Sequence, residues 1–427
     1  MKVLVVGGGG REHALCWRLA QDPTVTRVLA TPGNAGIATS AECFQDVAAD
    51  DLDGIVNVVD HHDVDLTVVG PEVPLVAGLA DRLRKQGRTV FGPSAAAARI
   101  EGSKAFAKEV MARRGVPTAR AGAFDDVEKA VGFVDELGGE AVIKADGLAA
   151  GKGVTVARDR ATAVAAIEAS LTEGVFGPAG RTVVVEEVLD GPEVSVFAVT
   201  DGKGDCALLD AAADHKRVGD GDTGPNTGGM GAYSPVPFLD QATATHILDT
   251  VIAPVVDELR PYRGVLFAGM MLTEDGPKVL EFNCRFGDPE TQALLPRMPY
   301  RVGTLLHACA TGRLAYEAGQ AGFDDGAAVT VVIASGGYPG DYETGIPIIG
   351  VGDALTIEGV NVFHAGTAYD PEWGLVTAGG RVLTVTGQGR NLNEARERAY
   401  RGVAEVHFDG MQFRTDIAAR AAWEEAP

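Results

Sequence analysis

The chain has 427 residues, of which 46% are hydrophobic and 22% charged, and a formal net charge of −22. This length exceeds what one hydrophobic core serves, so we expect roughly two to four domains. An acidic chain lacks the basic face that nucleic acids and anionic membranes require, so neither is an expected partner. No stretch reaches the roughly 18 apolar residues of a membrane helix, the N-terminus lacks the layout of a signal peptide, and the five scattered cysteines predict a reducing cytoplasm.

The first hundred residues alternate short apolar runs with helical patterns. The apolar runs lie at 3–6, 27–30, 66–69 and 89–91, and helical patterns include 12–20 and 75–86. Alternating strands and helices predict a parallel sheet with crossover connections. We therefore expect an N-terminal parallel α/β domain over residues 1–100.

Four glycines, 7–10, and Arg11 follow the first apolar run. Backbone N–H groups between a strand and a helix form an anion site. The dinucleotide fingerprint G-x-G-x-x-G fails, because its third glycine is replaced by Glu12. The loop thus suits a monophosphate better than a nicotinamide cofactor, and a tight turn without a ligand remains an alternative.

A second glycine-rich loop lies in the middle of the chain. A helix is predicted over 103–114, and strands at 141–145 and 153–157 flank the loop at 147–153. Lys144 and Lys152 can neutralise a triphosphate while loop N–H groups donate to it. The Walker A pattern is absent, and an ordinary β-hairpin is the alternative interpretation.

Carboxylates and an amide follow at two later strands. Residues 186–189 end a strand and Glu193 follows them, which suits the backbone groups that an adenine needs and the carboxylate that a ribose needs. Glu281 and Asn283 alternate along one strand and therefore share a face. Their oxygens are ligands that Mg²⁺ accepts. A solvated strand face is the alternative, which the neighbouring Arg285 disfavours.

The rest of the chain predicts a further unit. The polar, glycine-rich segment 214–235 is too long for a plain turn. Strands are expected at 328–334 and 381–386. An amphipathic helix follows, with one face formed by Leu392, Ala395, Ala399 and Val403.

This ordered set of motifs resembles the ATP-grasp superfamily. Two stretches narrow the resemblance: the segment 214–235, which begins Asp-His-Lys-Arg-Val-Gly-Asp, and the run Arg-Phe-Gly-Asp-Pro-Glu at 285–290. Both are similar to signatures of the phosphoribosylamine–glycine ligase family, also called glycinamide ribonucleotide synthetase. Segments 7–14, 70–72, 377–382 and 413–417 also resemble that family, so the resemblance covers essentially the whole chain.

The resemblance implies an α/β ATP-grasp fold. The parallel-sheet domain at 1–100 would be followed by a core of 101–122 and 191–325, a mobile lid at 123–190 and a C-terminal α+β domain at 326–427. It also implies an activity in de novo purine biosynthesis: glycine, 5-phosphoribosylamine and ATP give glycinamide ribonucleotide, ADP and phosphate through a glycyl phosphate, with Mg²⁺ or Mn²⁺. The partners would be these small molecules, and the chain would be a monomer or a weak dimer.

The same resemblance implies roles for individual residues. Those expected to bind ATP are Lys104, Lys144, Gly147, Gly151, Lys152, Gly153, Glu186, Glu187, Val188, Leu189 and Glu193. Those expected to bind substrate are Gly9, Gly10, Arg11, Glu72, Arg217 and Asn226. Catalytic roles fall to Arg285, Asp214 and Lys216, and metal binding to Glu281 and Asn283.

Several of these roles stay open at this point. Arg285 would clamp either the transferred phosphoryl group or the glycine carboxylate, and Asp214 would receive the glycine ammonium. Lys216 and Arg217 fit either a phosphate contact or a salt bridge that anchors the loop. His215 fits a structural hydrogen bond as well as a base.

Two other classes of function compete with this interpretation. One is an ATP-grasp enzyme that uses bicarbonate, such as a biotin-dependent carboxylase subunit or a carboxyaminoimidazole-forming enzyme, which the segment 214–235 disfavours. The other is a regulatory module that only senses a nucleotide. The set Glu281, Asn283 and Arg285 disfavours it, because a sensor needs no apparatus for phosphoryl transfer.

Overall fold

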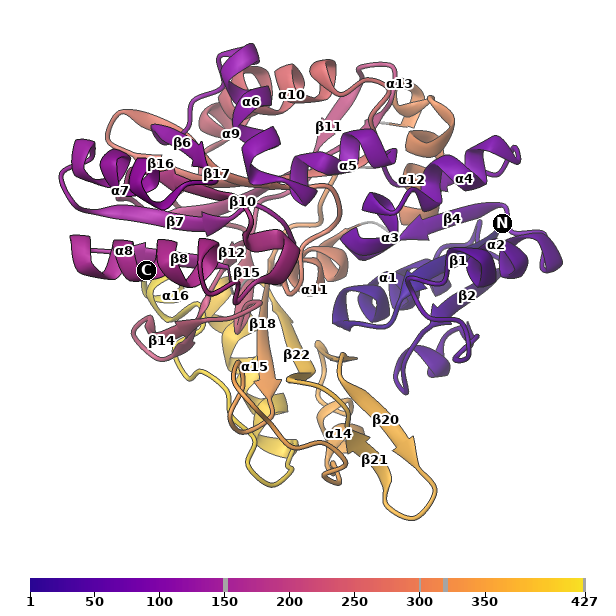
Figure 1. The fold of residues 1–427 in the computed structure, drawn as a ribbon. Helices are drawn as coiled ribbons and strands as arrows, with labels where there is room; N and C mark the ends of the chain where they lie inside the picture. Colours follow the sequence, from indigo (N-terminus) through magenta and orange to yellow (C-terminus); the bar gives the residue numbers. More distant parts are fainter. Residues whose placement is uncertain (149–152, 299–300, 318–321, 425–427) are drawn as a thin grey trace.

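The computed structural model describes residues 1–148, 153–298, 301–317 and 322–424. Figure 1 shows the N-terminal sheet on the right, the sheet formed within residues 121–186 with its own helices on the left, and the C-terminal sheet below. Among the described residues, no helix has both the length and the apolar character needed to cross a membrane.

The N-terminal sheet is parallel, as predicted. Its strand order is β3-β2-β1-β4-β5, from β3 (Glu42–Cys43), β2 (Arg27–Pro32), β1 (Lys2–Gly7), β4 (Leu66–Val69) and β5 (Val90–Phe91). Helices α1 (Gly10–Ala20) and α2 (Leu52–His61) form crossovers. Because the strands are parallel, the turns after β1 and β4 meet at one edge of the sheet, where ligands bind in such folds.

One predicted helix of this unit is wrong. The pattern at 75–86 predicted a single helix, whereas the structure has α3 (Glu72–Val76) and α4 (Leu79–Lys85). Gly78 separates them with φ of 88°, a left-handed conformation that interrupts the helix and that glycine adopts without strain. Helix α3 begins at Glu72, directly after the turn that follows β4.

A separate antiparallel sheet has the strand order β6-β9-β7-β8, from β6 (Ala121–Phe124), β9 (Val183–Glu186), β7 (Ala141–Ala145) and β8 (Val154–Ala157). Helices α7 (Val127–Glu136) and α8 (Arg160–Leu171) pack on it, and the unit has its own hydrophobic cluster, which includes Val134, Ile143 and Ile167. The two strands predicted to flank the glycine loop are confirmed as β7 and β8, which pair antiparallel. Gly151 and Lys152 lie outside the described residues.

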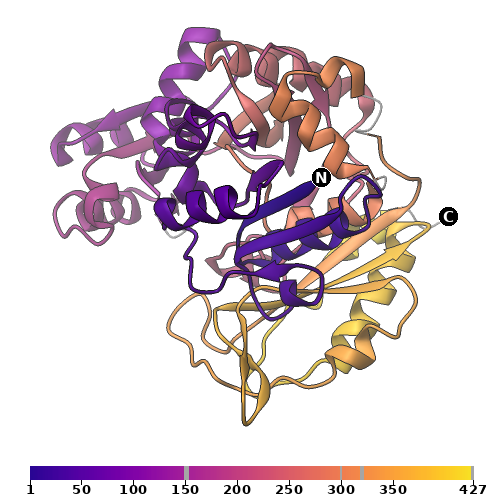
Figure 2. The same ribbon diagram turned by 90° about the vertical axis from the view of Figure 1, so that its right-hand side faces the viewer.

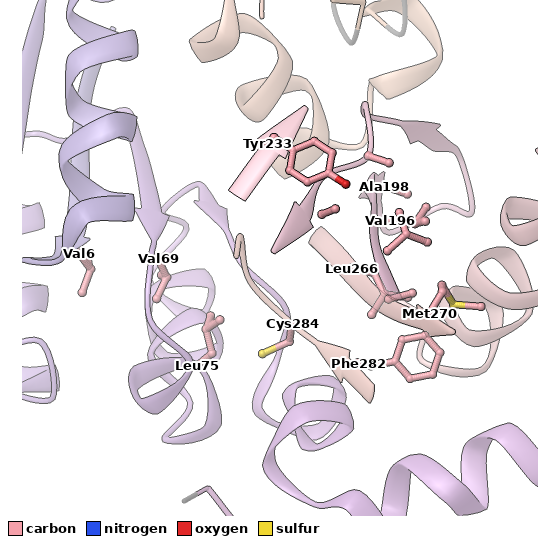
Figure 3. Packing of buried hydrophobic residues seen from close by; sticks show 14 of the residues in the cluster. Val6, Val69, Leu75, Val196, Ala198, Tyr233, Leu266, Met270, Phe282 and Cys284 are labelled. Atoms are coloured by element: carbon pink, nitrogen blue, oxygen red, sulfur yellow. The ribbon is translucent and has the colours of Figure 1, made fainter. Parts of the chain in front are cut away.

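A second antiparallel sheet forms the core, with the order β11-β10-β16-β17. Its strands are β11 (Cys206–Leu208), β10 (Glu193–Asp201), β16 (Arg263–Thr273) and β17 (Gly276–Asn283). Figure 3 shows Val196, Leu266, Met270 and Phe282 packed together on these strands. The helices of this region are α5 (Ala95–Gly102), α6 (Lys104–Arg114), α9 (Gln241–Ile247), a π-helix (Leu248–Ile252), α10 (Ala253–Glu258), α11 (Glu290–Leu294), α12 (Val302–Thr311) and α13 (Leu314–Glu317).

Two strands of the C-terminal sheet lie at the two ends of the polar segment 214–235. Its order is β12-β15-β18-β22-β19, from β12 (Ala213–Asp214), β15 (Gly231–Ser234), β18 (Ala327–Ala334), β22 (Arg381–Gly389) and β19 (Val360–His364). The predicted amphipathic helix is α15 (Leu392–Glu405), whose four expected apolar residues are buried. The remaining strands and α-helices are β13 (Arg217–Gly219), β14 (Thr223–Asn226), β20 (Thr367–Asp370), β21 (Gly374–Thr377), α14 (Val351–Ala354) and α16 (Ala419–Glu424).

Two histidines join the N-terminal and C-terminal sheets, which Figure 2 shows one above the other. The Nδ1 atom of His13, on α1, accepts a hydrogen bond of 2.7 Å from the backbone N–H of His364, on β19. The side chain of Asn34 also donates to the His364 carbonyl, at 2.8 Å. Burial lowers the pKa of His13 to about 3, with a further contribution from His364, and burial lowers the pKa of His364 to about 4.

We expect this contact to make the protein less stable in mild acid. Both imidazoles stay neutral in the folded protein, whereas in the unfolded chain each takes up a proton with a pKa of about 6.5. Their contribution is therefore fully present above that pH and is lost as pH falls toward 4. Unfolding measured from pH 7 to 4 should depend on pH less steeply in His13→Gln, by up to about 1.4 kcal/mol per pH unit. The exposed His407→Gln should match wild type, and equal slopes for His13→Gln and wild type would contradict the assignment.

Candidate active site

Glu281, on β17, is the centre of a group of positive charges from different parts of the fold. Burial raises the pKa of its carboxyl group, but Lys216, Lys144, Lys104 and Arg285 outweigh that effect and lower the pKa. These cations come from α6, from β7, from the turn after β12 and from the turn after β17. The structure thus brings together four cations that the sequence predicted, around the carboxylate of Glu281, which it also predicted.

Lys144 connects the sheet of β7 to the core sheet. Its Nζ donates to the backbone carbonyl of Leu280 at 2.9 Å and pairs with Oε1 of Glu186 at 3.1 Å. Lys108 pairs with the other oxygen of Glu186, also at 3.1 Å. The Glu186 side chain, only 3% exposed, therefore positions two lysines and offers little surface to a ligand.

The beginning of the glycine loop is tied to α6. Asp146 accepts hydrogen bonds from the Ser103 hydroxyl at 3.0 Å and from the Ala105 N–H at 2.7 Å. Lys104 donates from Nζ to the Gly147 carbonyl at 3.2 Å. At the other end of the loop, the carbonyl of Gly153 accepts from the N–H of Ala145 at 2.8 Å. These contacts tie the start of the loop to α6 and its described end to β7.

The connection between β9 and β10 contains the remaining residues predicted to bind the nucleotide. Glu187 accepts from the N–H of Arg120 at 3.0 Å, and Val188 and Leu189 are half-buried beyond it. A surface hollow beside Glu187 and Val188 is lined mainly by α7 and the turn after it, and it includes no residue of the Glu281 group. Glu193 begins β10.

The side chains of Lys216 and Asp214 interact electrostatically with each other. Lys216 pairs with Oε2 of Glu193 at 2.6 Å, which gives the loop-anchoring interpretation of Lys216 an observed partner. Burial lowers the pKa of Lys216, but Glu193, Asp214 and Glu281 outweigh it and raise the pKa. Burial raises the pKa of Asp214; Lys216 opposes this, while the nearby Glu290 adds to it.

Arg285 contacts two carboxylates and the predicted metal ligand. Its Nε donates to Glu72 at 3.1 Å, and its Nη2 lies 2.7 Å from Glu101 and 3.1 Å from the Asn283 side-chain oxygen. Nη1 donates to the carbonyl of Phe286 at 3.2 Å. The guanidinium therefore joins α3 of the N-terminal unit to the end of β17.

The N-terminal glycine loop is arranged around Glu12. Its carboxylate accepts from the Gly9 N–H at 2.7 Å and pairs with Nε of Arg11 at 2.5 Å. A side chain at Gly70 would place its Cβ 2.0 Å from the Glu12 carboxylate, so glycine at this position makes room for Glu12. Arg11, 6% exposed, also donates to the Phe286 carbonyl at 3.1 Å. The position of the third glycine of the dinucleotide fingerprint is therefore occupied by a glutamate whose carboxylate binds the loop itself.

Arg217 and Asn226, which were predicted to bind substrate, and His215, which was considered as a base, make their contacts away from the Glu281 group. Arg217 and Asn226 are partners across the β13–β14 pair, and Arg217 donates to the Gly224 carbonyl at 2.7 Å. None of the contacts found among the described residues joins either of them to the Glu281 group. Burial lowers the pKa of His215 to about 4, so its imidazole is neutral at neutral pH.

The sequence interpretation missed several residues that shape the site. Arg381, on β22, pairs with Asp288 at 3.2 Å and donates to the carbonyl of Gly228 at 2.6 Å, which brings the C-terminal unit to the site. Both Asp288 and Arg381 lie in runs that resembled the family, so a signal existed for them. Glu101 and Lys108 have no local motif, because their importance comes only from what they contact.

The donor set fits a divalent cation that is shared with phosphates. No group of three or more histidine, cysteine, aspartate or glutamate side chains suited to a metal ion occurs in the described part of the chain. Glu281 supplies a carboxylate close to three lysines, and Asn283 supplies an amide oxygen beside Arg285. Mg²⁺ is commonly held by one or two carboxylates plus substrate phosphates and water, so such a site needs no larger protein cage.

The two antiparallel sheets meet where Lys144, on β7, donates to the carbonyl of Leu280, on β17. The overall fold is similar to that of the biotin carboxylase domain of the Hydrogenobacter thermophilus 2-oxoglutarate carboxylase, with a TM-score of 0.74 at 18% identity, covering 96% of this chain and 91% of that one. At this identity the likeness shows the fold alone. The predicted ATP-grasp fold is confirmed by the match of residues 102–291 to the family model of an ATP-grasp (A) domain.

Family models and relatives of higher sequence identity show to which family of ATP-grasp proteins the chain belongs. Family models match for phosphoribosylglycinamide synthetase, with its N domain at residues 1–101, its ATP-grasp (A) domain at 102–291 and its C domain at 328–420. Phosphoribosylamine–glycine ligases from Nostoc sp. and Streptomyces coelicolor are 50% and 51% identical, covering 98% and 99% of this chain and 99% and 100% of theirs. The crystal structure of the Thermotoga maritima phosphoribosylamine–glycine ligase has a TM-score of 0.81 at 33% identity, covering 98% of this chain and 100% of that one. The chain belongs to the phosphoribosylglycinamide synthetase family, as predicted.

Proposed function

We propose that the protein joins glycine to 5-phosphoribosylamine at the expense of ATP, giving glycinamide ribonucleotide, ADP and phosphate. Relatives at about half identity over their whole length carry the name of this activity. The observation in the structure that carries the proposal is the group of lysines and Arg285 around Glu281. Such a group suits the transfer of a phosphoryl group, whose negative charge must be stabilised.

The chemistry follows from the poor reactivity of a carboxylate. An oxygen of the glycine carboxylate attacks the γ-phosphorus of ATP, and ADP leaves with the electrons of the broken P–O bond. The amine nitrogen then attacks the carbonyl carbon of the glycyl phosphate, the C–O bond breaks, and phosphate leaves as the nitrogen loses a proton. The protein's part is to position these groups and to stabilise charge.

ATP would lie between the two antiparallel sheets. Lys104 and Lys144 would bind phosphate oxygens, Val188 and Leu189 would offer backbone groups to the adenine, and Glu193 would accept from the ribose. Glu281 and Asn283 would hold Mg²⁺ or Mn²⁺, which supplies positive charge to the phosphates. The unit at 123–190 would act as a lid, because an acyl phosphate is lost if water reaches it.

Glycine and the sugar would meet at the Arg285 side of the site. Asp214 would accept the glycine ammonium, and Arg285 would clamp the phosphoryl group or the glycine carboxylate with its planar fork. Gly9, Gly10 and Arg11 would bind the sugar phosphate, and Glu72 the sugar hydroxyls. The contact between Glu72 and Arg285 supports a shared site for both substrates.

Arg11→Ala should weaken phosphoribosylamine binding and leave ATP and glycine binding nearly unchanged. A charge-assisted contact to a phosphate is worth about 1.5–3 kcal/mol, so the KM for the amine should rise roughly ten- to hundredfold. Steady-state kinetics that vary each substrate, with the amine generated in situ, measure this. Arg27→Ala, which removes an exposed arginine at the opposite end of the sheet, is the control. A changed KM for ATP, or no change at all, would refute the assignment.

The function itself is tested by the requirements of ADP release. We expect ADP to form at full rate only when glycine and phosphoribosylamine are both present. Release that depends on bicarbonate, or that ignores both substrates, would favour the competing carboxylase or nucleotide-sensor interpretations. The protein is also proposed to act in the cytoplasm, as its acidic composition and scattered cysteines suggest, which cell fractionation would check.

A further inference from the structure

Glu101 is a buried glutamate to which the proposed function assigns no role. It lies in the last turn of α5, where the helix dipole disfavours a negative charge. Its side chain is 7% exposed, and burial raises its pKa, with Arg285 opposing and Glu72 adding to this effect. A carboxylate that is both buried and close to the C-terminal end of a helix needs compensation from specific contacts.

Those contacts are with two consecutive residues of the turn after β17. One oxygen of Glu101 lies 2.7 Å from Nη2 of Arg285, and the other accepts the backbone N–H of Cys284 at 2.8 Å. Figure 3 shows Cys284 between Leu75 of the N-terminal unit and Phe282 of the core strand. Glu101 therefore fixes both the backbone of this turn and the direction of the guanidinium that follows it.

The two carboxylates that contact Arg285 are not equivalent. The Glu72 side chain is 26% exposed and meets Nε, whereas Glu101 is nearly enclosed and meets Nη2. The same Nη2 lies 3.1 Å from the Asn283 oxygen. Glu72 can thus exchange its partner for a substrate group, while Glu101 keeps the guanidinium beside Asn283.

We propose that Glu101 is a positioning residue, which holds Arg285 and the Cys284 backbone in the arrangement that phosphoryl transfer needs. The inference rests on the proposed role of Arg285. Glu101 itself contacts no substrate and acts only through the turn at 284–285. Neutralising it should therefore reduce kcat and leave substrate affinities nearly unchanged.

Glu101→Gln tests this with little change of shape. The amide keeps an acceptor for the Cys284 N–H but presents no charge to Arg285. We expect kcat to fall about 10- to 100-fold, as for other residues that orient catalytic groups, and the KM values for ATP and glycine to stay within about threefold. Glu109→Gln, an exposed glutamate on α6, is the matched control and should behave as wild type.

A double-mutant cycle separates positioning from general support of the fold. Arg285→Lys keeps a charge, so residual turnover should be measurable. If Glu101 acts through Arg285, Glu101→Gln should cost less than about threefold further kcat in the Arg285→Lys background, because interacting residues are not additive. Effects that multiply, or a loss confined to KM, would overturn the proposal.

Further results distinguish a failure of the positioning role of Glu101 from a failure of the proposed ligase function. If Arg285→Lys alone has wild-type kcat, the proposed role of Arg285 is wrong and the positioning role of Glu101 is overturned with it, whereas the proposed function stands as long as ADP release requires both substrates. If Glu101→Gln does not fold, Glu101→Asp in the same cycle replaces it. Glu101→Asp keeps the charge but is one methylene shorter, so a partial loss of kcat that again vanishes in the Arg285→Lys background is expected.

Discussion

Replacing Glu281 with glutamine should lower kcat by about 10²- to 10³-fold, the usual cost of losing one preorganised electrostatic group. The change keeps the shape of the side chain and removes the charge that Lys104, Lys144 and Lys216 face. It also weakens one of two proposed ligands for the divalent cation. Raising the concentration of Mg²⁺ should recover only part of the activity, because the lysines stay unbalanced.

The β16–β17 hairpin supplies a control for this change. Glu274 is exposed in the turn of the same hairpin, so Glu274→Gln should have wild-type kcat and the same thermal unfolding as wild type. Steady-state ADP release at saturating Mg²⁺ compares the two variants. Activity of Glu281→Gln within a few-fold of wild type would contradict the proposed role of Glu281.

Lys144→Met should reduce kcat/KM for ATP by about 10²- to 10³-fold. The ammonium of Lys144 is fixed by Leu280 and Glu186 close to Glu281, so it is preorganised for a phosphate. Lys108 still neutralises Glu186 in the variant, and the fold should therefore survive. The KM for glycine should change little, because Lys144 belongs to the nucleotide side of the site.

Lys129→Met is the matched control for this variant. Lys129 is exposed on α7 of the same unit, so its loss should leave kcat/KM for ATP unchanged. Isothermal titration calorimetry of each variant with ATP measures the affinity for ATP directly. Wild-type ATP affinity and turnover in Lys144→Met would show that this lysine supports only the junction of the two sheets.

Local signals explain why much of the fold could be predicted. The parallel sheet follows from apolar runs separated by helical patterns, and α15 follows from the spacing of its four apolar residues. The break at Gly78 was missed, because a glycine inside a helical pattern does not by itself reveal a left-handed conformation. Strands β12 and β15 were missed as well, since two and four residues are too few for a periodic signal.

The site shows the same division between local and distant information. Glu281 and Asn283 were predicted as neighbours because alternation along a strand is a local property. The contact of Arg285 with Glu72 spans 213 positions, and nothing in either segment indicates the other. Glu12 was read only as a missing glycine, whereas its carboxylate occupies the space that Gly70 leaves open. Contacts made by tertiary packing determine these roles.

The proposed glycyl phosphate makes a direct prediction about one oxygen atom. If the glycine carboxylate attacks the γ-phosphorus, one carboxylate oxygen becomes the bridging atom and departs with phosphate when the amine attacks. Glycine labelled with oxygen-18 in its carboxylate should therefore give phosphate that carries one labelled oxygen per turnover, detectable by phosphorus NMR. Phosphate without label, formed while glycinamide ribonucleotide accumulates, would contradict an acyl-phosphate mechanism at this site.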